Sequence, residues 1–296
     1  MLGNVSRAVR SGQIPRSHFF ALQDRAAYVP PFSNMDRLFL GLATVFFAGG
    51  FIYAIACLRA GKYRHSTGNL ISIVVGLVCQ TFFLYERGQL HGRCPVTNVL
   101  EILVFVSWAM VLIYLVVGRT YRLSLMGVFT SPVVFVTCLM ALLFPLDYEG
   151  ASAAAALKGK ADAWVEFHIG ISLLAYGAFG MSFIAGVMFL IQERQVRQAN
   201  LKTLFYSLPP MQNLNSALLR LLIVGMVLLT AGIGSAHVIT ASGNQHPIWP
   251  LYLIWLVYAL LCFVNFFSGL SPRRLATGAT VAFLFPLVSL WVIASH

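Results

Sequence analysis

Eight long apolar runs follow one another along this chain, and they limit its possible folds more than any other feature. Each run is continuous and about twenty residues long, the length that a helix needs to cross the hydrocarbon core of a bilayer. A membrane barrel would instead show segments of about ten residues with alternating hydrophobicity. The runs lie near 38–58, 69–85, 99–117, 123–144, 165–191, 218–240, 249–268 and 275–294. The sequence therefore predicts an all-α polytopic integral membrane helix bundle of about eight transmembrane helices.

The composition excludes the two main alternatives to a membrane protein. Hydrophobic residues make up 59% of the 296 residues, and charged residues make up only 10%, against about 25% in an average soluble domain. A soluble enzyme of this size could not cover so much apolar surface with polar groups. A disordered chain is excluded as well, because 13% of the residues are aromatic and such chains contain few aromatic residues.

We expect two parts in the chain. Residues 1–36 form a polar, basic N-terminal tail without the apolar stretch of a cleavable signal peptide. Residues 37–296 form a single eight-span membrane domain, since no connection between the runs is long enough to separate two domains. The bilayer is therefore the first partner that the sequence predicts.

The positive charges that give the chain its net charge of +11 indicate how the chain is oriented in the membrane. The connections after the odd-numbered runs carry eleven Lys and Arg residues, whereas those after the even-numbered runs carry four, Arg87 among them. Because cytoplasmic loops are rich in Lys and Arg, the odd loops should face the cytoplasm of a bacterial-type inner (cytoplasmic) membrane. The basic tail contradicts this orientation, as it would then lie outside. We expect no nucleic-acid partner.

Sequence patterns of common catalytic sites are missing. The chain contains no phosphate-binding glycine loop and no G-x-S-x-G or H-E-x-x-H sequence. It also lacks C-x-x-C, so neither a thiol–disulfide relay nor a c-type haem attachment site is expected. We expect the chain not to be an enzyme by itself.

Five of the seven histidines gather on the outer side in this topology: His91, His168, His237, His246 and His296. Imidazole is a common axial ligand of haem iron, and two imidazoles from different helices can hold one iron. The plainer interpretation is that these histidines are hydrated at the membrane surface. Helical spacing places His168, Ser172 and Tyr176 on one stripe of the fifth run.

Two acidic residues are further candidates. Glu101 lies at the start of the third run, where an ionisable group suggests a functional site. Asn98 precedes it by three positions, so the pair could equally form a capping box at a helix start. Glu166, two residues before His168, could orient a partner or could simply be solvated.

Several segments resemble the cytochrome c assembly proteins, a superfamily that includes the CcsA, HemX and YpjD types. Residues 164–176 read WVEFHIGISLLAY and resemble the family's H-x-x-x-S-L-L-x-Y segment. Residues 94–101, CPVTNVLE, resemble its P-x-x-N-x-x-E span, and residues 255–259, WLVYA, its W-L-x-Y-A segment. The likeness covers about residues 38–296.

The resemblance implies an eight-span protein that handles haem. In CcsA-type members two outer histidines flank a tryptophan-rich loop, and their counterparts here are His168 by motif and His296 by position. The loop itself differs, because residues 243–250 read GNQHPIWP and retain only Trp249 of the W-G-x-x-W-x-W-D pattern. The chain thus looks closer to the HemX or YpjD branch. His237 and His246 are less favoured ligands.

The hypothesis that follows is ligation of haem iron by His168 and His296 at the outer membrane face. A membrane partner of a cytochrome c assembly system would supply the apocytochrome, and the chain would be one component of that haem-attachment system. Because iron binds neutral imidazole, haem binding should weaken below about pH 6. Two alternatives remain open: a haem-free scaffold or regulatory subunit of a membrane complex, and a small-molecule transporter with Glu101 in its path.

Overall fold

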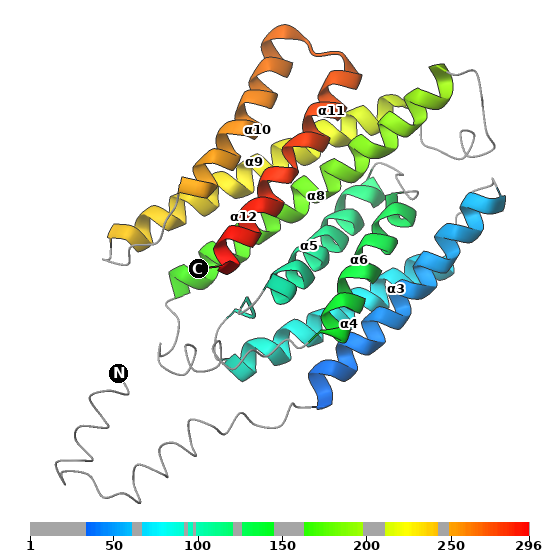
Figure 1. Ribbon diagram of the computed structural model, residues 1–296, viewed down its shortest axis with the longest axis vertical. Helices are drawn as coiled ribbons and strands as arrows, with labels where there is room; N and C mark the ends of the chain where they lie inside the picture. Colours follow the sequence, from blue (N-terminus) through cyan, green and yellow to red (C-terminus); the bar gives the residue numbers. More distant parts are fainter. Residues whose placement is uncertain are drawn as a thin grey trace, which may run out of the picture.

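The computed structural model describes residues 34–60, 67–91, 94–96, 99–120, 126–144, 163–197, 211–241 and 249–295. Every regular element in these ranges is an α-helix, which confirms the predicted fold class (Figure 1). The helices are α3 (Asn34–Ala60), α4 (Thr67–His91), α5 (Val99–Thr120), α6 (Met126–Leu143), α8 (Ala163–Arg197), α9 (Met211–Ala241), α10 (Trp249–Ser268), α11 (Pro272–Ala282) and α12 (Leu284–Ser295). The first seven are each long and apolar enough to cross a membrane.

The helices from α3 to α11 alternate in direction and α12 continues α11, so the helix ends gather at two ends of the bundle (Figure 1). One end holds the termini Ala60, Thr67, Arg197 and Pro272, and we name it the basic end. The opposite end holds the starts of α5 and α8 and the end of α9, and we name it the histidine end. The described helix ends that flank the odd connections thus lie at one end of the bundle, and those that flank the even connections lie at the other.

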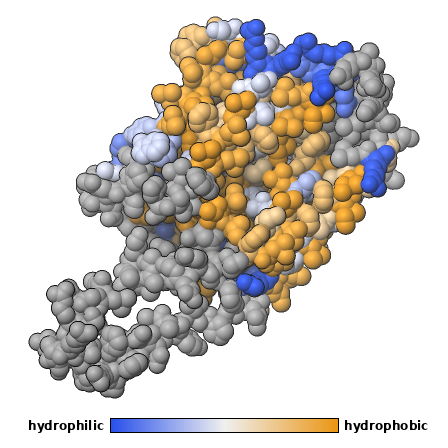
Figure 2. Space-filling view, in the orientation of Figure 1, coloured by the Kyte–Doolittle hydropathy of each residue, from blue (hydrophilic) through white to orange (hydrophobic). Residues whose placement is uncertain are grey.

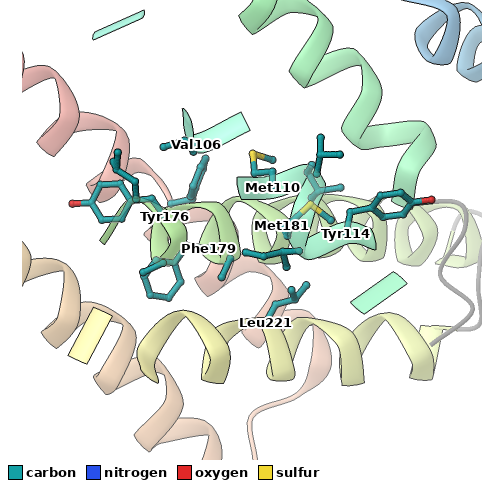
Figure 3. Packing of buried hydrophobic residues seen from close by; sticks show 14 of the residues in the cluster. Val106, Met110, Tyr114, Tyr176, Phe179, Met181 and Leu221 are labelled. Atoms are coloured by element: carbon teal, nitrogen blue, oxygen red, sulfur yellow. The ribbon is translucent and has the colours of Figure 1, made fainter. Parts of the chain in front are cut away.

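Helix α8 forms the centre of the bundle. It contacts α5 and α6 on one side and α9 and α11 on the other, and Figure 1 shows it between these two groups. In the most apolar stretch of α8, 72% of the residues are buried, whereas in that of α10 only 17% are buried. Figure 3 shows the packing, with Tyr176, Phe179 and Met181 of α8 between Met110 of α5 and Leu221 of α9. Many apolar side chains are exposed on the outside of the bundle, where they form a surface suited to contact with lipid (Figure 2).

Small residues allow α8 to pack closely against two neighbours. A Cβ atom at Gly177 would lie 2.6 Å from the Cβ atom of Ala109 on α5. A Cβ atom at Gly186 would lie 3.1 Å from the carbonyl oxygen of Ala276 on α11. Membrane helices associate through such close backbone contacts. The small-residue spacing of Ala178, Ser182 and Gly186 accordingly lies in the buried part of α8.

The eighth predicted span consists of two helices. α11 and α12 together run from Pro272 to Ser295, and the chain turns at Phe283 between them. Pro286 explains the break, because a proline lacks an N–H and its ring clashes with the carbonyl group four residues earlier, here that of Ala282. The expectation of about eight spans therefore corresponds to seven single helices and this broken pair.

Several helix boundaries differ from those that the sequence suggests, and two of the differences bury a charged residue. α4 continues to His91 and buries Arg87 completely, so the assignment of Arg87 to a loop is wrong. α3 begins at Asn34 and includes Asp36, so the predicted tail of residues 1–36 extends too far by its last three residues. Buried charge partners, described below, hold both residues within the bundle.

Candidate functional site

A cavity of about 320 Å³ lies at the histidine end, between α5, α8, α9, α10 and α12. We name it the histidine cavity, and its lining is Val96, Ile102, Val165, His168, Ile169, Ser172, Leu173, Tyr176, Ala236, Ile239, Thr240, Pro250, Leu251 and Leu290. Most of these side chains are apolar, and none is a carboxylate. A mainly apolar cavity with a few converging polar groups is typical of a site for a small molecule or cofactor.

His168 is the titratable group with the best-defined geometry in this lining. Its Nδ1 atom lies 2.8 Å from the carbonyl oxygen of Gly232 and 3.2 Å from the hydroxyl of Ser235, both on α9. Because a carbonyl oxygen only accepts, Nδ1 must donate and therefore carries the proton. The lone pair of the neutral ring then lies on Nε2, the atom that would ligate a metal. Metal-binding histidines are commonly oriented by such a bond to a backbone carbonyl.

Ser172 and Tyr176 continue the polar stripe of α8 into the cavity, as the helical spacing predicts. The Tyr176 hydroxyl lies 3.1 Å from the hydroxyl of Ser289 on α12. The Ser172 hydroxyl has no hydrogen-bond partner among the described residues, although the side chain is only 7% exposed. A buried hydroxyl without a partner is unfavourable, so the cavity offers a polar point of contact to a ligand.

Beside the cavity, three charged side chains meet inside the bundle. Arg87 of α4 donates to Glu101 of α5, at 2.7 Å from its Nε, and also pairs with Asp36 of α3 at 3.4 Å. All three side chains are buried. This cluster joins three helices whose residues are far apart in the sequence. Glu101 thus takes part in an interhelical ion pair, while the next residue, Ile102, lines the histidine cavity.

A thiol lies between this charge cluster and the start of α8. Cys94 is partly buried, in the short segment that precedes α5. Its burial, with smaller contributions from the negative charges of Glu166 and Glu101, raises the pKa of the thiol to about 11. Val96, two residues later, lines the histidine cavity. The segment 94–96 therefore covers part of the cavity and carries a thiol with a raised pKa.

The structure brings together some of the predicted site residues and separates others. His237 is exposed, and its Nε2 atom bonds with the hydroxyl of Tyr252 on α10, outside the cavity lining. Trp249 is 61% exposed, although the next two residues, Pro250 and Leu251, line the cavity. Glu166 is partly exposed near the start of α8. Among the histidines that the structure describes, His168 is the one that lines the cavity.

Three further candidates lie outside the described residues: Asn98, His246 and His296. Leu290 of α12 nevertheless lines the histidine cavity, and α12 ends at Ser295, next to His296 in the sequence. The ion pair of Arg87 with Asp36 was not predicted from the sequence. The sequence did contain one indication of a buried arginine, because Arg87 follows closely after an apolar run that contains no positive charge.

The fold and the site define a class of protein: a polytopic membrane helix bundle with a mainly apolar cavity at one end, whose described lining includes one histidine. The profile of the family described as Cytochrome C assembly protein matches residues 96–294. The matched stretch covers more than half of the chain and includes the described walls of the histidine cavity. The chain therefore belongs to the cytochrome c assembly protein family, as the motifs suggest.

Individual proteins are similar to this chain at low identity. The chain is 24% identical to Protein HemX of Bacillus subtilis (strain 168) over 271 residues, covering 88% of this chain and 95% of that protein. It is 26% identical to Cytochrome c biogenesis protein CcsA of Prochlorococcus marinus (strain AS9601), covering 77% of this chain and 81% of that protein. CcsA of Chlorella vulgaris is 26% identical, covering 60% of this chain and 53% of that protein.

Proposed function

We propose that this protein holds haem at the histidine end, with the imidazole of His168 as an axial ligand of the iron, for the assembly of cytochrome c. The observation that carries the proposal is the bond from His168 Nδ1 to the carbonyl oxygen of Gly232. It fixes the tautomer that presents Nε2 as a ligand, and it does so in the wall of an apolar cavity. When bound, haem would supply the iron and the prosthetic group that a cytochrome c requires.

The residues present fit a partly enclosed haem. The apolar walls suit the faces of a porphyrin, and the volume of about 320 Å³ lies at the lower end of the range for ligand pockets, about 300–1,000 Å³. A cavity of this size would cover the part of the ring nearest His168. The described lining contains no tryptophan, in keeping with the missing tryptophan-rich pattern. Contact would therefore rest on aliphatic side chains and Tyr176.

Each neighbouring group has a distinct task in this arrangement. The Gly232 carbonyl orients His168, and the Ser235 hydroxyl, which also donates to that carbonyl at 2.7 Å, supports the same bond. The aliphatic wall excludes water from the ligating nitrogen, as the apolar surroundings of metal sites commonly do. The Ser172 hydroxyl provides a hydrogen-bonding group deeper in the cavity. His168 would thus be oriented before any ligand arrives.

The second ligand in this proposal is His296, and a membrane partner of the assembly system would bring the apocytochrome. Support for His296 comes from Leu290 on α12, which lines the same cavity. Support for an outward-facing histidine end comes from the sequence, where the connections after odd-numbered runs carry eleven basic residues and those after even-numbered runs carry four. The basic N-terminal tail runs against this orientation.

An absorption spectrum of the purified full-length protein, oxidised and dithionite-reduced, tests the proposal. We expect a Soret band in the wild type, as isolated or after haem addition. His168→Ala and His296→Ala should each lose or shift this band. His237→Ala is the matched control, because His237 is exposed outside the cavity lining, and it should keep the wild-type spectrum.

Two results would count against the proposal. A wild-type protein that stays colourless after haem addition would favour the haem-free scaffold or the transporter instead. A Soret band that is unchanged in His168→Ala, in a protein that still folds, would show that haem binds elsewhere.

A further inference from the structure

A second hollow lies at the basic end, far from the histidine cavity. It has a volume of about 620 Å³ between the end of α8 and the start of α11. We name it the basic groove, and its lining is Arg197, Ser271, Arg273, Arg274, Thr277 and Gly278. Figure 2 shows hydrophilic residues gathered at this end of the molecule, next to the apolar surface. The rule for cytoplasmic loops explains why basic residues occur here, but it does not require three of them to line one groove.

The charges in the basic groove are not balanced by the described neighbours. Glu193 lies 2.9 Å from Nε of Arg197 and 3.5 Å from Nε of Arg273. One carboxylate thus holds two guanidinium groups through their Nε atoms, while each guanidinium has four further N–H donors. With Arg274, the group of three arginines and one glutamate keeps a charge of +2.

The position of two arginines at a helix start adds to this imbalance. Arg273 and Arg274 lie in the first turn of α11, which contains no acidic residue. The start of a helix carries a partial positive charge that favours anions, so arginines are electrostatically unfavourable there. Ser271, at the cap position, makes no side-chain capping bond. An anion in the groove would offset the repulsion between the two arginines and the helix.

We propose that the basic groove binds a phosphate group, that of an anionic phospholipid in the membrane leaflet at the basic end. Guanidinium groups bind phosphate oxygens through paired hydrogen bonds. The lipid as source follows from the surface beside the groove. Phe266 and Phe267, at the end of α10, are 83% and 69% exposed, and only three residues separate α10 from α11. A headgroup in the groove would therefore have its acyl chains next to an apolar surface.

Native mass spectrometry of the full-length protein, titrated with lipids of matched acyl chains, tests this site. Phosphatidylglycerol should bind more tightly than phosphatidylcholine to the wild type. A basic residue near an anionic membrane contributes about 1 kcal/mol, or about fivefold in affinity. Arg273→Gln with Arg274→Gln should therefore weaken phosphatidylglycerol binding about 25-fold, and Arg197→Gln about fivefold.

The matched control is Arg59→Gln. Arg59 is exposed in the last turn of α3, also at the basic end, but it does not line the groove. Its removal changes the net charge equally and should leave phosphatidylglycerol binding unchanged. Equal losses in Arg59→Gln and Arg273→Gln would overturn the proposal, as would unchanged binding in the double variant. If the double variant does not fold, Arg197→Gln alone tests the site, because Arg197 is exposed in the last turn of α8 and its replacement should not disturb folding. Unchanged phosphatidylglycerol binding in Arg197→Gln would then overturn the proposal.

A competition with inorganic phosphate shows whether the groove binds a lipid headgroup or free phosphate, since both present phosphate oxygens to the arginines. For a lipid site, millimolar phosphate should displace little bound phosphatidylglycerol, since the acyl chains add to the affinity. Tight phosphate binding that depends on Arg273 and Arg274, without preference for phosphatidylglycerol, would support the phosphate site but overturn the lipid as its ligand. These measurements need no haem, so they are independent of the proposed function.

Discussion

His168 on α8 and Gly232 on α9 are joined by a hydrogen bond of 2.8 Å from the imidazole Nδ1 to the backbone carbonyl oxygen. The bond can form because the two helices lie close together at this point. A Cβ atom on Gly232 would come within 2.6 Å of the Ser172 hydroxyl oxygen. One glycine therefore permits both the helix contact and the orientation of the proposed ligand.

Gly232→Ala should disturb this arrangement. The added methyl group must displace Ser172 or separate α8 from α9, and overpacking of this kind costs about 1–3 kcal/mol. Loss of the orienting bond should reduce haem affinity about 10–100-fold, as with other groups that orient a ligand. Gly234→Ala is the control, since nothing lies within 4 Å of a Cβ atom there. Haem titration of both variants measures the difference, and equal affinities would contradict this role of Gly232.

The buried charge cluster should be important for stability. Arg87→Gln removes the positive charge between Asp36 and Glu101 and leaves two buried carboxylates. Breaking a buried ion pair in this way costs about 3–5 kcal/mol. Glu193→Gln, which removes the more exposed pairs with Arg197 and Arg273, should cost less than about 1 kcal/mol. Thermal unfolding in one detergent compares the two variants, and similar unfolding temperatures would show that the cluster contributes little.

These two sites also show what the sequence can and cannot predict. Apolar runs depend on local composition, so the helices and even the stripe of His168, Ser172 and Tyr176 could be predicted. The partners of Arg87 could not, because Asp36 lies 51 residues before it and Glu101 14 residues after it. Such pairing depends on the packing of three helices. The break at Phe283 was missed because hydropathy stays high through Pro286, although the proline itself was a visible signal.

The Cys94 thiol should react slowly with alkylating reagents. Its pKa is raised from 9.0 to about 11, and only the thiolate is the nucleophile. At pH 8 the thiolate fraction is therefore about 100-fold below that of an ordinary thiol, and the alkylation rate should rise with pH up to about 11. Because the carboxylate of Glu166 contributes to the increase, Glu166→Gln should speed the reaction. A variant with Cys94 as its sole cysteine allows the measurement, and a rate that levels off below pH 9 would contradict it.

An exposed cysteine at the histidine end tests the orientation in the membrane. A membrane-impermeant maleimide added to intact cells should label Trp164→Cys in a cysteine-free protein, because Trp164 is exposed near the start of α8 and the histidine end is proposed to face outward. Thr277→Cys, placed in the basic groove of a cysteine-free protein, should be protected until the cells are opened. The reverse pattern would show that the count of basic residues misleads for this chain.

The ligation of iron by His168 is tested most directly by removing the imidazole and then returning it. In His168→Gly the side chain is absent, and free imidazole can occupy the space that it leaves in the cavity. We expect haem affinity to fall at least about tenfold in this variant and to recover, with the wild-type absorption spectrum, when millimolar imidazole is added. Unchanged affinity in His168→Gly, or a loss that imidazole does not restore in a folded protein, would contradict the account.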